Sequence, residues 1–237
     1  MSEASKPIKP EGPPRLPGQR AVRPKSAATV LILRQDGPKP RLLMGRRHSG
    51  HSFMPDRWVF PGGRVDRGDW SAPAANDLTP EAQAVFEARV RPGLARALAM
   101  AAVRETWEET GLLLARPAPP RPGAGPWRSF LAAGALADLS ALTVVGRAIT
   151  PPTIAKRFDT WAFIADAERL MTLERQPDCG ELEEIAWLEF EEALALKLPT
   201  ATRVFVKEAA ARLNEAGRPL PFVRFRQGAV RIGALEH

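Results

Sequence analysis

The sequence is organised around residues 102–112, A-V-R-E-T-W-E-E-T-G-L, in which three glutamates recur at helical spacing. On a helix that turns about 100° per residue, Glu105, Glu108 and Glu109 fall within a sector about 100° wide. Like charges on one helix face repel each other, and a hard divalent cation with oxygen ligands would neutralise them. The other interpretation is a solvated acidic face. The opposite side of the same helix is apolar and carries Met100, Val103 and Trp107.

A glycine-rich turn precedes this helix and favours the metal interpretation. The apolar segment 58–60 is followed by P-G-G-R-V-D-R-G-D, residues 61–69. Glycine has no side chain, so Gly62 and Gly63 allow the backbone to approach a ligand or another segment closely. The sequence therefore predicts that this turn and the acidic helix form one site.

Together the two segments resemble the Nudix box, G-x5-E-x7-R-E-U-x-E-E-x-G-U, where U is a bulky apolar residue. There are two departures from the family pattern: Asp69 stands where the family has Glu, and 34 residues rather than 7 separate it from Arg104. In addition, Thr106 stands at the first U position. The residues that match are Gly63, Arg104, Glu105, Glu108, Glu109, Gly111 and Leu112.

A box divided by an insertion resembles one subgroup of this family, which includes peroxisomal coenzyme A diphosphatases. Two segments carry this narrower resemblance: F-M-P-D-R-W-V-F-P-G-G-R-V-D before the insertion, and R-F-D-T-W-A-F-I-A after the box. It implies an α/β/α sandwich with a mixed central sheet. It also implies hydrolysis of a diphosphate bond in a nucleoside diphosphate derivative, such as coenzyme A or an acyl-CoA. ADP-ribose and dinucleotides stay open as substrates, as does a nucleotide sensor without activity.

The resemblance also implies roles for particular residues. Mg²⁺ or Mn²⁺ would bind to Glu105, Glu108 and Glu109, because oxygen ligands suit these cations and no Cys/His cluster suggests zinc. The expected catalytic residues are Glu105, Arg104 and, as base, Glu181 in the acidic loop 178–184, where the neighbouring carboxylates are alternatives. The expected substrate-binding residues are Gly62, Gly63 and the phosphate-binding candidates Arg46, Arg64 and Arg157, each of which is more often a solvated surface arginine.

Composition limits the other classes of function. The formal net charge is +7, but the excess lies in residues 1–25 and 218–237, so nucleic-acid binding is not expected. A single cysteine, Cys179, excludes an internal disulfide and favours a reducing compartment, so we expect a cytoplasmic protein. No apolar run is long enough to span a membrane. Family members often form dimers, so a homodimer is also expected.

The pattern of apolar residues predicts one domain over residues 25–232, with a disordered segment at 1–24 and a tail at 233–237 that resembles part of a tag. Thr79 is expected to cap a helix inside the insertion, at about 70–92, and the insertion is expected to bulge from the surface beside the site and to help select the substrate. His48 and His51 could bind a metal, although a solvated role is favoured. Strands are expected at 27–33, 41–46, 58–60, 141–145, 160–165, 185–188 and 222–225, and helices at 94–110, 127–139, 189–196 and 200–216.

Overall fold

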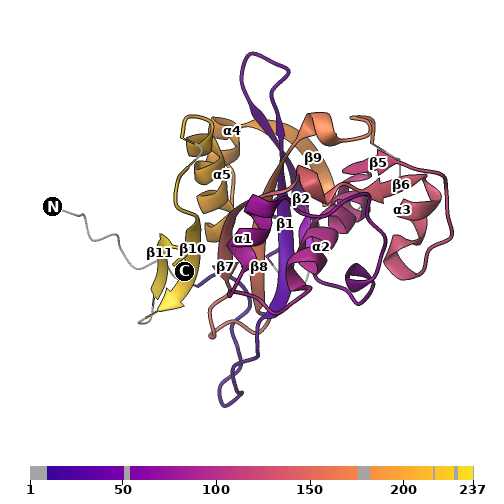
Figure 1. The fold of residues 1–237 in the computed structure, drawn as a ribbon. Helices are drawn as coiled ribbons and strands as arrows, with labels where there is room; N and C mark the ends of the chain where they lie inside the picture. The colour runs from indigo at the N-terminus through magenta and orange to yellow at the C-terminus, as the bar shows by residue number, and fades with distance from the viewer. Residues whose placement is uncertain (1–9, 51–53, 176–181, 216, 227–228, 237) are drawn as a thin grey trace.

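A computed structural model describes residues 10–50, 54–175, 182–215, 217–226 and 229–236 of the chain. In this part of the chain, nine strands form one sheet in which β1 and β8 are parallel, as are β7 and β10, while the other pairs are antiparallel (Figure 1). The strands are β1 (Lys25–Arg34), β2 (Arg41–Arg47), β3 (Trp58–Val59), β4 (Gly62–Arg64), β7 (Thr143–Ile149), β8 (Phe158–Asp166), β9 (Leu182–Glu189), β10 (Pro221–Arg226) and β11 (Ala229–Ala234).

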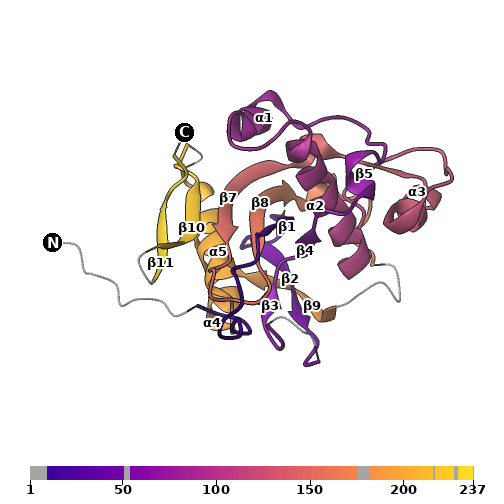
Figure 2. The ribbon, with the colours of Figure 1, turned by 90° about the horizontal axis from the view of Figure 1, so that it is seen from below.

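Helices cover both faces of this sheet, which confirms the α/β/α arrangement (Figure 2). The α-helices are α1 (Pro80–Phe86), α2 (Leu94–Thr110), α3 (Arg128–Ala132), α4 (Phe190–Ala195) and α5 (Thr200–Arg212). The shorter elements are the 3-10 helices η1 (Gly68–Trp70), η2 (Gly125–Trp127), η3 (Leu139–Ala141) and η4 (Ala167–Arg169), and the two-stranded sheet of β5 (Ala115–Pro117) and β6 (Ala135–Ala137).

Strand β1 shows how the sheet separates the two cores. Successive side chains of a strand point to opposite faces. Val30 and Ile32 therefore belong to the core under α1, α2 and α3, whereas Leu31 and Leu33 belong to the core under α4 and α5. Burial on both faces explains why this strand reads as a continuous apolar run rather than as an alternating one.

The box helix begins and ends where the sequence predicts. Gly111 adopts φ 70° and its N–H donates to the carbonyl of Trp107, which ends α2 in the left-handed conformation that glycine favours. Thr106 tolerates a buried position because its hydroxyl donates to the carbonyl of Ala102 at 2.8 Å. A threonine can thus replace the bulky apolar residue of the family pattern without leaving its hydroxyl unpaired.

The insertion is part of the core, so the prediction of a surface bulge is wrong. Thr79 caps α1 as expected. Phe86, at the end of α1, is 3% exposed, and its ring centroid lies 4.6 Å from that of Trp161 on β8. Leu78 and Ala82 join the same core. The apolar residues of the insertion cover one face of the sheet, as the position of α1 over β7 and β8 shows (Figure 2).

Three other expectations need correction. Residues 10–24 contact the body of the protein, since Arg15 N–H donates to the carbonyl of Thr153, so this part of the N-terminal segment is not a free tail. Strand β11 was not predicted, and it includes Gly233 and Ala234 of the supposed tail. The helix expected at 127–139 is limited to α3, and the chain then continues into β6.

Of the residues described, no helix is both long and apolar enough to cross a membrane.

We predict that Phe86→Ala lowers the free energy of unfolding by about 3–5 kcal/mol, because it leaves a cavity between the insertion and the sheet. Urea unfolding measures the change. Glu87→Ala, at an exposed position one residue later, is the control and should change it by less than about 0.5 kcal/mol. An unchanged midpoint for Phe86→Ala would mean that the insertion contributes nothing to the core.

Candidate active site

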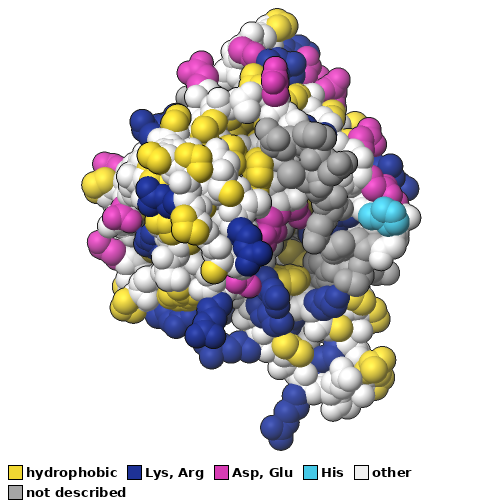
Figure 3. Space-filling view, turned by 90° about the vertical axis from the view of Figure 1, so that its right-hand side faces the viewer, with side chains coloured by type: hydrophobic (Ala, Val, Ile, Leu, Met, Phe, Trp, Pro, Cys, Tyr) yellow, Lys and Arg dark blue, Asp and Glu magenta, His cyan; other side chains and the backbone are white. Residues whose placement is uncertain are grey.

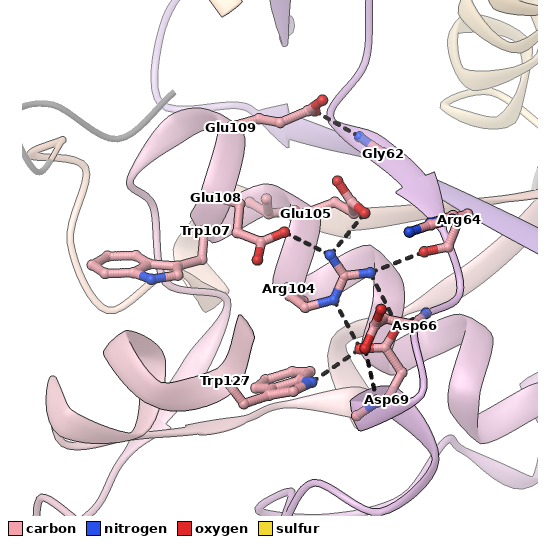
Figure 4. Close-up of polar contacts among 12 residues, drawn as sticks. Gly62, Arg64, Asp66, Asp69, Arg104, Glu105, Trp107, Glu108, Glu109 and Trp127 are labelled. Atoms are coloured by element: carbon pink, nitrogen blue, oxygen red, sulfur yellow. Dashed lines mark hydrogen bonds and ion pairs between the residues drawn. The ribbon is translucent and has the colours of Figure 1, made fainter. Parts of the chain in front are cut away.

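The two halves of the divided box meet through a buried ion pair. Arg104 on α2 donates from Nε and Nη2 to the two carboxylate oxygens of Asp69 on η1, at 2.9 and 3.0 Å. Their side chains are 5% and 0% exposed. Asp69 also accepts from Trp127 Nε1 at 2.9 Å and from the backbone N–H of Asp66 at 2.7 Å. Asp69 and Arg104 are therefore paired directly, and the insertion between them does not separate the two halves of the box in space (Figure 4).

Arg104 also holds the glutamates in place. Its Nη1 lies 2.8 Å from Glu105 Oε1 and 2.6 Å from Glu108 Oε2, and its Nη2 donates to the carbonyl of Arg64. Burial opposes the charge of the guanidinium, but the hydrogen bonds and charges of its carboxylate partners outweigh burial and raise the pKa of Arg104. Arg104 is therefore a permanent cation at the centre of the acidic cluster.

The glycine turn lies directly against the acidic helix. The N–H of Gly62 donates to Glu109 Oε2 at 2.8 Å. A side chain at Gly63 would collide with the carboxylate of Glu105, and one at Gly62 would collide with β1. Both glycines are thus required for close approach, as the sequence predicts.

The ionisation of Glu105 is shifted by its surroundings. Its side chain is 14% exposed. Burial raises the pKa of Glu105 to about 6, although the charge and hydrogen bond of Arg104 act in the opposite direction. A carboxylate with this pKa changes its charge close to neutral pH.

A cavity of about 520 Å³ opens at the end of the sheet where β1 and β8 begin and β7 ends. In the space-filling view, acidic side chains lie in a hollow with Lys and Arg side chains around it (Figure 3). Glu105, Glu108 and Glu109 line it on the α2 side. On the α5 side it is lined mainly by Thr200, Ala201, Phe205, Val223 and Val230.

The structure brings most of the predicted site residues to this cavity and leaves two out. Gly62, Gly63 and Arg64 line it, and Arg104 lies behind the glutamates. The lining, as far as the structure describes it, contains neither Arg46 nor Arg157, and it contains no residue of the insertion. The insertion therefore does not contribute to the described lining of this cavity, and a role in substrate selection stays a prediction. Glu181, the predicted base, lies outside the described residues, as do His51 and Cys179.

Arg46 and Arg157 are paired elsewhere. Arg46 forms ion pairs with Asp56, Glu183 and Glu184. Arg157 donates to the carbonyls of Thr150 and Val22. The guanidinium groups of these two arginines therefore have partners outside the described cavity lining, and a role in phosphate binding stays a prediction for both.

The adjacent residues Arg47 and Lys156 line the cavity instead. A shift in strand register between Arg46 and Arg47 marks a β-bulge, and a bulge changes the direction in which a side chain points. The sequence shows a pair of arginines but gives no sign of this bulge. Glu11, which also lines the cavity, was missed because the N-terminal segment was expected to be disordered, and Thr200 was predicted only as the start of a helix.

In donor chemistry the site fits a divalent cation. Among the described residues no three His, Cys, Asp or Glu side chains converge on one point, because Arg104 and Gly62 hold the glutamates apart. Mg²⁺ commonly uses only one or two carboxylates and completes its coordination with water and substrate oxygens. The residues that could hold it are Glu105, Glu108 and Glu109. His48, which was considered as a metal ligand, lies 3.1 Å from Glu183 and does not line the cavity.

Known proteins resemble this chain in part of its sequence and in its fold. No protein-family model matches the chain. The acyl-coenzyme A diphosphatase NUDT19 of Gallus gallus is 38% identical over 135 aligned residues, a match that covers 43% of this chain and 35% of the relative. The match thus spans about a third of that relative's length.

Solved structures extend the similarity over most of the chain. A Nudix hydrolase from Alicyclobacillus acidocaldarius is 27% identical, with a TM-score of 0.56, and the match covers 78% of this chain and 90% of that one. The Nudix domain of Shewanella oneidensis NrtR, in complex with ADP ribose, is 13% identical with a TM-score of 0.49, and that match covers 81% of this chain and 90% of that domain. The chain therefore has the fold of the first of these Nudix hydrolase structures, and the two halves of its box meet at Arg104 and Asp69 as the resemblance to that family predicts.

Proposed function

We propose that the chain is a divalent-metal-dependent hydrolase that cleaves the diphosphate linkage of a nucleoside diphosphate derivative, with coenzyme A or an acyl-CoA as the substrate. The observation that carries this proposal is that Glu105, Glu108 and Glu109 line one wall of a cavity whose volume suits a small molecule. The choice of substrate is supported by the 38% identical relative, which is named as an acyl-coenzyme A diphosphatase.

The acidic wall explains why a cation is needed. A diphosphate is an anion, and three glutamates would repel it. A divalent cation bound to these glutamates would neutralise the diphosphate charge and lower the pKa of a bound water molecule. Arg47, Arg64 and Lys156 also line the cavity and supply positive charge for the phosphate oxygens.

The protein residues have distinct roles in this proposal. Arg104 orients Glu105 and Glu108 from behind and does not line the cavity. Without metal, burial raises the pKa of Glu105 to about 6, so Glu105 has to lose its proton before it can bind a cation. The base expected at Glu181 stays a prediction, because this residue lies outside the described part of the chain.

A panel of substrates tests the activity and its specificity. The chain is incubated with Mg²⁺ and coenzyme A, an acyl-CoA, ADP-ribose, a dinucleotide, a nucleotide sugar or a nucleoside triphosphate, and the products are identified by mass spectrometry. Fastest cleavage of coenzyme A or acyl-CoA supports the proposal. Faster cleavage of ADP-ribose or the dinucleotide would assign the alternative substrate class, and binding without cleavage of any compound would identify a nucleotide sensor.

Assembly and location stay part of the proposal. The resemblance favours a homodimer, which light scattering after size-exclusion chromatography measures directly. The cytoplasmic location rests on the single cysteine, and fluorescence of the tagged full chain in its own cells tests it.

We predict that Mg²⁺ stabilises the protein at pH 7.5 and that this effect fades below about pH 6, because a cation requires ionised Glu105. Without metal, Glu105 has a higher pKa in the folded protein than in the unfolded chain. The free energy of unfolding should therefore fall as pH rises from about 4.5 through about 6, because the folded protein retains this proton longer. Thermal unfolding with Mg²⁺ or EDTA measures both effects. Glu105→Gln should remove them, and a Mg²⁺ shift that is equal at pH 5 and pH 7.5 would contradict the assignment.

We predict that Glu108→Gln lowers kcat by about 10²-fold or more, because it removes a charge that holds the cation in the transition state. Stability should change by less than about 1 kcal/mol, since the side chain is 34% exposed and Arg104 keeps its other partners. Steady-state kinetics and urea unfolding give the two values. Glu191→Gln, at an exposed position on α4, is the matched control and should leave both unchanged. If a folded Glu108→Gln variant keeps near-normal turnover, the acidic face is a solvated surface and does not bind a catalytic cation.

A further inference from the structure

Residues 10–24, which we call the N-terminal strap, cross one side of the candidate active site. Arg15 N–H donates to the carbonyl of Thr153 at 2.8 Å, and Ala155 N–H donates to that of Pro13 at 3.0 Å. The segment that the strap contacts is the connection between β7 and β8. This connection lines the cavity through Thr150, Pro151 and Lys156.

The strap is joined to the other side of the cavity by one carboxylate. Glu11 Oε2 accepts from the backbone N–H of Thr200 at 2.7 Å and from its hydroxyl at 3.0 Å. Thr200 is the first residue of α5, where backbone N–H groups have no partner within the helix and an anion is favoured. Glu11 itself lines the cavity, as do Pro199, Thr200 and Ala201.

The wall at Glu11 lies on the side of the cavity that does not carry the glutamates. Glu105, Glu108 and Glu109 belong to α2, whereas Thr200 belongs to α5, and the two helices pack on opposite faces of the sheet (Figure 2). The cavity extends from one helix to the other around the end of the sheet. A diphosphate held by a cation at the α2 side would leave the α5 side of the cavity open to the group attached to it.

We propose that the N-terminal strap, held to α5 by Glu11, forms the wall that binds the group attached to the diphosphate and so sets the affinity for substrate. Glu11 is a positioning residue in this proposal, because it acts through the strap and Thr200. The inference rests on the proposed function for the identity of the ligand. The bond that is cleaved lies at the α2 side, so loss of the strap contact should weaken binding and spare the chemical step.

Glu11→Ala tests the proposal in the full chain. It removes both hydrogen bonds to Thr200, and KM for coenzyme A should rise about tenfold while kcat stays within about twofold. Glu11→Gln should restore KM, because its amide oxygen accepts the same two hydrogen bonds. Arg20→Ala, at an exposed position on the strap that does not line the cavity, is the matched control and should leave KM unchanged.

Two further measurements separate this role from a structural one. The Mg²⁺-dependent shift of the melting temperature should be the same in Glu11→Ala and wild type, because the α2 side is intact. An unchanged KM for Glu11→Ala would overturn the proposal. So would a parallel fall of kcat and melting temperature that Glu11→Gln does not restore, because it would indicate a general defect in folding.

Binding of ADP, measured by calorimetry, keeps the two proposals distinguishable. If the wild-type chain binds ADP but cleaves no diphosphate, the proposed function fails. The strap inference then depends on the Kd for ADP, which should rise about tenfold in Glu11→Ala and be restored in Glu11→Gln. An equal Kd in all three proteins would overturn the strap inference.

Discussion

The site depends on one buried cation, the guanidinium of Arg104. Burying an ion pair is costly, and the pair persists only if hydrogen bonds satisfy both partners. Here Arg104 donates to Asp69, Glu105, Glu108 and the carbonyl of Arg64, and Asp69 accepts from Trp127 as well. This network fixes the glycine turn against α2 and positions the glutamates, so that the acidic wall is formed before any ligand binds.

The same contact explains how the box tolerates an insertion. The entropy of closing a loop grows only slowly with its length, so a longer connection between Asp69 and Arg104 costs little if its residues find a place in the fold. They do, because Phe86 packs against Trp161 and extends the core. Aspartate suffices at position 69 because η1 brings its short side chain within reach of the guanidinium.

The cavity combines segments from both layers of the sandwich. Its acidic wall comes from the α2 layer and its opposite wall from α5 and the N-terminal strap. A site at the end of the sheet can therefore bind the two parts of a substrate with different groups: charge near α2, and a mostly apolar surface with Glu11 and Thr200 near α5.

The sequence alone determined the local features of the site. The spacing of the three glutamates, the glycine turn and the stop at Gly111 depend on helix periodicity and backbone conformation, which neighbouring residues encode. Only the tertiary structure decided which basic residues reach the cavity. Arg46 and Arg47 are adjacent and chemically alike, yet only Arg47 lines the cavity, and a bulge in β2 lies between them. In the same way, Lys156 lines the cavity and its neighbour Arg157 does not. Long-range packing likewise placed the insertion in the core and the N-terminal strap over the cavity, because both depend on partners far away in the sequence.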